Sequence, residues 1–211
     1  MARRTPAAAA RGGRRDEVLR AAEALFAQRG YRGVGLREIA AQVGMRAPSL
    51  FKHFTSKKAL YDAVLLNIFH RLDTVAGRLE GNQSFAARLE AYLRGYVDLV
   101  SRDPSVVPLL FREMMERRDA MQPATRARAF TIYRRVDAFL EAGQQAGVFR
   151  RADRASLHIT LSGAILYHAL AARSYRAALG NHGKAPSREA WKRTVLATAQ
   201  AMLLKQPKLA R

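Results

Sequence analysis

Apolar residues recur at helical spacing along most of the chain, and no stretch alternates apolar and polar residues for long enough to predict a strand. The pattern begins near residue 15, where one side of a helix is formed by Val18, Leu19, Ala22, Leu25 and Phe26. Gly30 ends this run and suits the position that follows a helix. The sequence therefore predicts an all-α protein of about nine helices.

Helix boundaries can be predicted along the rest of the chain from capping residues and glycines. Two short apolar patterns, 36–43 and 47–54, are separated by Gly44 and precede a longer helix from about 57 to 79, which Thr55 or Ser56 is expected to cap. Asp103 and Pro104 are expected to be an N-cap and the proline that follows it, ahead of a helix from Val106 to about Arg117. The remaining predicted helices cover about 84–101, 124–146, 153–179 and 187–204.

Composition limits the location and the chemistry of the protein. The 211 residues contain 37 Lys and Arg against 17 Asp and Glu, a net charge of +20 that attracts polyanions. The absence of cysteine excludes a disulfide scaffold, a thiolate metal site and a cysteine nucleophile. No apolar run approaches the roughly 18 residues of a membrane helix, and the basic first fifteen residues lack the apolar region of a signal peptide. We therefore expect a cytoplasmic protein without a membrane partner.

The chain divides into three predicted parts. Residues 1–14 form a basic arm, residues 15–60 a helix-turn-helix domain and residues 61–206 a helical ligand-binding and dimerisation domain. The positive charge is concentrated in the N-terminal 60 residues. Residues 1–60 carry 13 Lys and Arg against 4 Asp and Glu, whereas residues 61–211 carry 24 against 13.

The segment 36–54 has the pattern of a helix-turn-helix motif. Ala40 is small where the two helices would cross, and Gly44 permits a tight turn between them. The expected core of the motif is Ile39, Ala40, Gly44, Leu50 and Phe54. This arrangement leaves short or cationic side chains facing outward from the second helix, as a major-groove reader requires: Arg46, Ala47, Ser49, Lys52 and His53.

The motif and its flanks resemble the DNA-binding domain of the TetR family of transcription regulators over roughly residues 15–64. The matching residues are Gly30-Tyr31, Leu36-Arg-Glu-Ile-Ala40, Val43-Gly44, Leu50-Phe-Lys-His-Phe54 and Ser56-Lys-Lys-Ala-Leu60. The resemblance implies phosphate contacts by Arg37, His53 and Lys57, base reading by Arg46, Ala47, Ser49 and Lys52, and a homodimer on a palindromic operator of double-stranded DNA. It also implies a repressor released by a small-molecule effector, with the fourth helix linking DNA and effector.

Two residues depart from the family pattern. Phe51 stands where the family usually has a tyrosine whose hydroxyl binds a phosphate, so that contact is lost. Arg46 stands where serine or threonine is common, which exchanges a helix cap for a charge. We expect Arg46 to contact DNA.

Two further sets of residues are candidates for the effector pocket and the dimer interface. The pocket is expected to be mainly apolar and adaptable, with Phe69, Tyr92, Tyr96, Phe111, Met114, Met115, Phe130, Tyr133, Tyr167 and His168 as candidates. The last two helices are expected to form the interface through Ile159, Gly163, Leu166, Leu170, Trp191, Val195 and Ala199. For both sets, packing within the protomer core is the alternative.

An enzyme is not expected. The sequence has no glycine-rich phosphate loop, no nucleophile elbow and no cluster of His, Asp and Glu at metal-ligand spacing. His158 and His168 are ten residues apart and would need outside ligands to share a metal, so neither metal nor cofactor is predicted. The alternatives are a DNA-binding factor of the same fold without an effector, and an all-α interaction module or enzyme with incidental positive charge.

Overall fold

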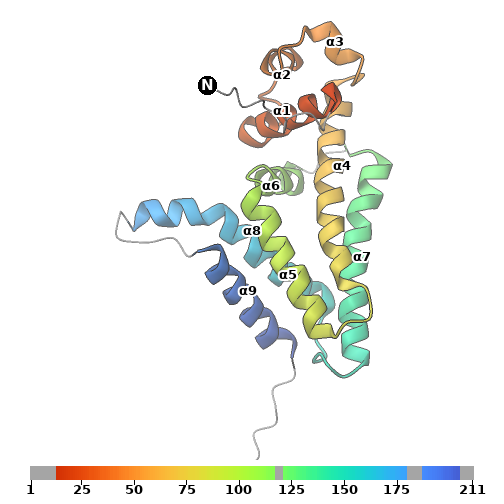
Figure 1. The fold of residues 1–211 in the computed structure, drawn as a ribbon, viewed down its shortest axis with the longest axis vertical. Helices are drawn as coiled ribbons and strands as arrows, with labels where there is room; N and C mark the ends of the chain where they lie inside the picture. Colours follow the sequence, from red (N-terminus) through yellow and green to blue (C-terminus); the bar gives the residue numbers. More distant parts are fainter. Residues whose placement is uncertain (1–12, 117–120, 180–186, 205–211) are drawn as a thin grey trace, which may run out of the picture. The chain divides into compact units, whose positions relative to one another are not determined.

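The computed structural model describes residues 13–116, 121–179 and 187–204. Within these ranges the chain forms nine α-helices and a short 3₁₀ helix, with one isolated bridge between Phe149 and Leu204 in place of any strand (Figure 1). The prediction of an all-α fold is therefore confirmed. Most of the predicted basic arm lies outside the described residues.

The helices form two compact units. The first unit comprises residues within Met1–Asn67 and Pro108–Thr125, and the second comprises residues within Ile68–Val107 and Arg126–Arg211. Helix α4 (Lys57–Ala76) supplies residues to both units, as does α6 (Val106–Glu116).

The first unit contains α1 (Arg14–Arg29), α2 (Leu36–Gln42), α3 (Ala47–Phe51) and the beginning of α4. Its core is built from the apolar faces that the sequence pattern predicts, with Val18, Phe26, Ile39 and Leu50 all fully buried. Burial of these side chains is the main source of stability for helices as short as α2 and α3, which could not persist alone.

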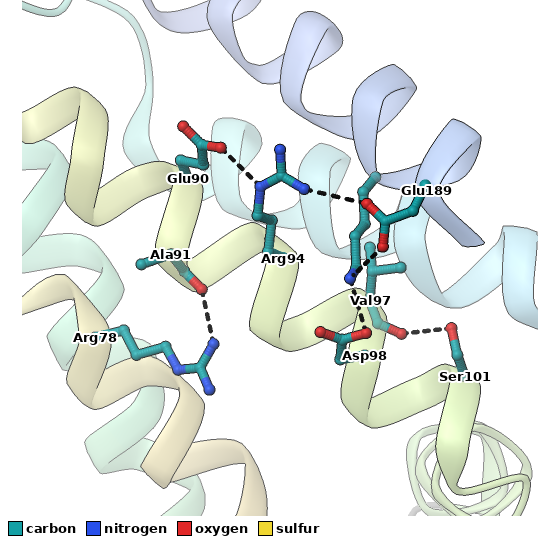
Figure 2. Close-up of polar contacts among 9 residues, drawn as sticks. Arg78, Glu90, Ala91, Arg94, Val97, Asp98, Ser101 and Glu189 are labelled. Atoms are coloured by element: carbon teal, nitrogen blue, oxygen red, sulfur yellow. Dashed lines mark hydrogen bonds and ion pairs between the residues drawn. The ribbon is translucent and has the colours of Figure 1, made fainter. Parts of the chain in front are cut away.

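The second unit contains the end of α4, the 3₁₀ helix η1 (Gly77–Leu79), α5 (Phe85–Arg102), most of α7 (Pro123–Gln145), α8 (Arg154–Ala178) and α9 (Arg188–Leu203). Helix α5 packs against both α8 and α9 (Figure 1). A charged network also joins α5 to α9 (Figure 2). In it, Arg94 contacts Glu90 at 2.7 Å and Glu189 at 3.4 Å, while Lys192 contacts Asp98 at 3.0 Å.

Side-chain caps begin four of these helices, and the cap at Ser56 is one that the sequence analysis predicts. The Ser56 hydroxyl accepts a hydrogen bond from the Ala59 N–H at 3.0 Å, and Ser84, Asp153 and Ser187 do the same for α5, α8 and α9. Hydrogen bonding to Ser156 lowers the pKa of Asp153, which keeps this cap ionised.

The helix α6 starts at Val106 as predicted, but the capping predicted at its start is wrong. The helix begins at Val106, so Asp103 is not its N-cap and Pro104 is not its first residue. Instead the Asp103 carboxylate accepts a hydrogen bond from the Ser105 N–H at 3.1 Å and pairs with Arg71 of α4. The side chain that was expected to cap a helix is thus used in a local turn and a tertiary ion pair.

One sequence expectation about membranes needs correction. The stretch Arg154–Ala172 of α8 is long and apolar enough to cross a membrane by length and composition, with a mean hydropathy of 1.3. One such helix is weak evidence for a membrane span, because a core helix of a soluble protein passes the same test. Only 22% of this stretch is buried, however, so part of its apolar surface has no partner among the described residues.

Candidate nucleic-acid interface

The turn between α2 and α3 is fixed by the backbone. Gly44 has a φ of +64°, a left-handed conformation that costs glycine little and other residues more. The carbonyl oxygen of Ala40 accepts hydrogen bonds from the N–H groups of Val43 at 3.2 Å and Met45 at 2.8 Å. The chain therefore reverses within a few residues and directs α3 away from α2.

Apolar contacts fix the orientation of α3 within the first unit. Ile39, Ala40, Leu50 and Phe54 are buried, and they lie on the side of the motif that packs against the rest of the unit. The guanidinium of Arg15 lies 5.0 Å from the centre of the Phe54 ring, so α1 also covers this residue. Because this side of α3 is anchored, its opposite side is presented to solvent in one orientation.

The outward side of the motif carries cations. Arg37, Arg46, Lys52 and His53 are exposed, and Ala47 and Ser49 are half-buried. Arg46 precedes the first residue of α3, where its side chain makes no capping hydrogen bond. Lys57 begins α4 and is half-buried against the Tyr31 ring, 4.6 Å from the ring centre.

No acidic residue occurs between Glu38 and Asp62, whereas this stretch contains Arg46, Lys52, Lys57 and Lys58. At the border of the stretch, Glu38 pairs with Arg29. Asp62 is buried and accepts hydrogen bonds from the Thr125 hydroxyl at 2.9 Å and the Gln122 N–H at 2.7 Å. All charged side chains of residues 39–61 are therefore positive at neutral pH or can become so, which favours contact with a phosphate backbone.

The structure adds residues to this surface that the sequence analysis did not select. Lys58 is exposed beside Lys57, and the adjacent pair of lysines was the signal that could have identified it. Tyr31 positions Lys57, and Arg15 covers Phe54; no local pattern predicts either contact, because each joins segments more than twenty residues apart.

The expected pocket residues do not come together in one place. A small cavity in the second unit has Tyr92 and Tyr96 in its wall, but none of the other eight candidates lines it. Phe69 is buried, Phe111 is half-buried, and Met114, Met115, Phe130, Tyr133 and Tyr167 are exposed. His168 stacks on Trp191 with ring centres 4.2 Å apart, whereas His158 lines the cavity. Next to Phe111, the Arg112 guanidinium donates to the Gln28 carbonyl oxygen at 3.4 Å.

The expected interface residues also divide into two groups. Leu166, Trp191, Val195 and Ala199 are buried within the protomer. Ile159 and Leu170 are exposed, and Gly163 lies between them on α8 with open space beside it. These exposed residues account for part of the uncovered apolar surface of α8.

Two features thus define the first unit. Buried apolar residues hold α2 and α3 together, and the exposed side of α3 carries cations and no acidic residue. This is a helix-turn-helix DNA-binding unit. A family model described as "Bacterial regulatory proteins, tetR family" matches residues 18–64, and one described as "Tetracyclin repressor-like, C-terminal domain" matches residues 86–199. The chain belongs to the TetR family of bacterial regulatory proteins.

Relatives and solved structures agree with this assignment. The chain is 34% identical over 99 residues to the HTH-type transcriptional activator FasR of Mycolicibacterium smegmatis, covering 46% of this chain and 45% of FasR. It is 33% identical over 104 residues to the transcriptional repressor KstR2 of Rhodococcus jostii, covering 47% and 49%. The aligned region thus spans about half the length of these relatives.

The structure of KstR2 of Mycobacterium tuberculosis, described as a ketosteroid transcriptional regulator, superposes with a TM-score of 0.70. It shares 21% sequence identity and covers 93% of this chain and 97% of its own. At this identity the likeness shows the fold alone.

Proposed function

We propose that the protein is a homodimeric repressor that binds a palindromic operator and is released from it by a small, mainly apolar effector. The observation that carries the proposal is the stretch 39–61, which contains no acidic residue and exposes cations on and beside α3. Leu50 and Phe54 are buried on the opposite side of α3 and anchor it. A rigid helix with cations on its outer side is what major-groove reading requires.

Roles follow from the position of each side chain. Arg46, Ala47, Ser49 and Lys52 lie on or beside α3 and are the proposed base-reading residues. Arg37 at the start of α2, His53 after α3 and Lys57 at the start of α4 are the proposed phosphate contacts. Lys57 has the further advantage of a helix N-terminus, where the backbone dipole adds to the attraction for an anion.

The exposed apolar face of α8 supports a homodimer. Gly163, Tyr167 and Leu170 follow Ile159 by 4, 8 and 11 residues, a spacing that places them on one side of the helix. Ile159 and Tyr167 are 70% and 67% exposed. A second copy of the chain would cover this face, and two helix-turn-helix units would read enough bases for useful specificity.

The sign of regulation and the location are part of the same proposal. Among the relatives, KstR2 is a repressor and FasR an activator, and the biofilm operon regulator IcaR of Staphylococcus aureus is a negative regulator. We propose repression from the cytoplasm, in the manner of KstR2 and IcaR.

Selection of bound duplexes from random DNA tests the proposal. The expected result is a palindrome whose half-sites are about 34–36 Å apart, or a multiple of one DNA turn. Affinity for this duplex should exceed that for scrambled DNA by at least about 10³-fold and should fall steeply with salt. Selection that enriches no sequence, or a single asymmetric site bound by one protomer, would contradict it.

A further inference from the structure

The second half of α6 belongs to the first unit, from Pro108 onward. Leu109 and Leu110 of this segment are buried. The guanidinium of Arg112 donates to the carbonyl oxygen of Gln28, one residue before the end of α1. The segment that follows Pro108 is therefore in direct contact with a helix of the DNA-binding unit.

A second polar contact joins the same segment to α4. The Tyr61 hydroxyl donates to the Glu113 carboxylate at 3.2 Å. An ionised acceptor makes this a strong hydrogen bond, and the Tyr61 side chain that it orients is only 2% exposed. Tyr61 follows Lys57 by four residues, so the two side chains lie on the same side of α4. Glu113 thus contacts α4 one turn after the first residue of that helix.

The Tyr61 ring links this contact to Lys57. The ring packs edge-on against Tyr31, with centres 5.1 Å apart, and edge-on against Phe26, with centres 5.2 Å apart. The Lys57 ammonium lies over the Tyr31 ring. Because close-packed rings cannot shift independently, the orientation of Tyr61 helps to set the position of Tyr31 and with it that of the lysine.

The start of α7 holds the same turn of α4. Asp62 accepts hydrogen bonds from the Gln122 N–H at 2.7 Å and the Thr125 hydroxyl at 2.9 Å. Gln122 directly precedes the first residue of α7, so a carboxylate of α4 caps the N-terminus of another helix. Because Asp62 is next to Tyr61 in the chain, this cap also restrains the backbone that carries the Tyr61 ring.

We propose that Glu113 of α6 is a positioning residue for DNA binding, which acts through Tyr61 and Tyr31 to hold the Lys57 ammonium where it meets a phosphate. This inference rests on the phosphate contact proposed above for Lys57. It gives an acidic residue a favourable effect on binding to a polyanion. Long-range electrostatics gives the opposite sign, because removal of a negative charge makes the protein more positive.

Glu113→Ala in the full-length protein tests the direction of the effect. Affinity for the selected operator and for unrelated duplex DNA should fall about two- to fivefold, and by no more than in Lys57→Ala. Glu113→Gln keeps an oxygen that can accept from Tyr61 and should retain most of the affinity. Tyr61→Phe lacks the donor and should match Glu113→Ala. Glu141→Ala is the control, because it removes the same charge from an ion pair with Arg154 in the second unit and should not weaken binding.

A double-mutant cycle shows whether Glu113 acts through Lys57. In a Lys57→Ala background, Glu113→Ala should cause no further loss of DNA affinity, because the ammonium that it positions is absent. A purely structural role of Glu113 would lower the affinity by the same factor in both backgrounds. Melting temperatures measured on the same four proteins show how far each substitution affects folding.

The position of the lysine can also be measured without DNA. The Lys57 ammonium lies over the face of the Tyr31 ring, so the ring current should shift the NMR signal of the adjacent methylene protons to lower frequency. In protein labelled with carbon-13 at lysine, this signal is identified by its loss in Lys57→Ala. It should move toward the frequency of an ordinary lysine in Glu113→Ala and stay in place in Glu141→Ala.

An unchanged Lys57 signal in Glu113→Ala would overturn the inference, whatever the DNA measurements show. Where Lys57→Ala weakens DNA binding, the inference is also overturned if Glu113→Ala binds as tightly as the unmodified protein, or if its loss of affinity persists in full in the Lys57→Ala background. Unchanged DNA affinity in Lys57→Ala would instead contradict the proposed phosphate contact. The NMR signal alone then decides whether Glu113 positions the lysine.

Discussion

The ammonium nitrogen of Lys57 lies 4.6 Å from the centre of the Tyr31 ring. The ring is itself fixed, because it packs edge-on against Tyr61 at 5.1 Å and stacks on Phe26 at 6.1 Å. The first residue of α4 is thus positioned by an aromatic cluster of the first unit, and its charge lies in the acid-free stretch next to α3.

Lys57→Ala should weaken binding to the selected operator and to unrelated duplex DNA by the same factor, because a phosphate contact carries no sequence information. The slope of log affinity against log salt should fall by about 0.9, corresponding to one neutralised phosphate. Fluorescence anisotropy across a salt series measures both quantities. Arg188→Ala removes one exposed charge from the second unit and should change neither; an unchanged slope in Lys57→Ala would refute the phosphate contact.

Tyr31→Leu tests the positioning of the lysine and keeps its charge. Operator affinity should fall about two- to fivefold, the value of a cation–π contact at a partly exposed site. The salt slope should stay the same, because no charge is removed. A slope that falls as in Lys57→Ala would show that the ring affects DNA by a route other than placing Lys57.

Phe51→Tyr should strengthen DNA binding. Phe51 is 50% exposed at the end of α3, so an added hydroxyl meets no packing obstacle and can reach a phosphate. One hydrogen bond of this kind should raise affinity by about fivefold on operator and unrelated DNA alike, with no change in melting temperature. Equal affinity of the two proteins would mean that no phosphate lies within reach of this position.

Acid should destabilise the second unit through its histidines. Burial lowers the pKa of His158 and of His168 below the ordinary value of 6.5, so the unfolded chain binds protons that the folded chain does not. The stability associated with the neutral rings is present above about pH 6.5 and is lost as the pH falls through the lower folded values. His158→Gln should reduce this pH dependence of the melting temperature, whereas the exposed His70→Gln should not.

The proposed homodimer can be tested on the exposed face of α8. Ile159→Lys with Leu170→Lys places two charges on this face, where they cost little in a monomer but would be desolvated in a dimer. Light scattering should then report the monomer mass and operator affinity should fall sharply. Val148→Lys, at an exposed apolar site on a different segment, is the control. A double variant that remains a dimer would place the interface elsewhere.

The parts of the fold that sequence could predict are those determined locally. Ser84, Asp153 and Ser187 begin helices because a hydroxyl or carboxylate can reach an N–H group three residues on, whatever the tertiary structure. The failure at Asp103 has the opposite cause. Its partner Arg71 is distant in sequence, and that ion pair is formed only once α4 has packed.

The same distinction applies to the cavity. Tyr92, Tyr133 and Tyr167 all lie in predicted helices, and the sequence does not distinguish them as pocket candidates. Of the three, only Tyr92 is buried, because other helices cover its side of α5. Likewise, the sequence analysis selects His168 as a pocket residue, whereas the structure places His158 in the cavity wall. Phe149 packs so closely on Gly143 that a Cβ there would overlap the ring, and no local pattern predicts this tertiary contact.

The most direct test of the central claim, that α3 reads DNA sequence, is the specificity of Arg46→Ala and Lys52→Ala. Each variant is compared with the unmodified protein by competition between the selected operator and scrambled duplex at one salt concentration. A base contact predicts a loss of operator affinity of about 1–3 kcal/mol, relaxed specificity at one position of each half-site and a much smaller loss on scrambled DNA. Unchanged discrimination between the two duplexes in both variants would contradict the assignment of α3 as the recognition helix.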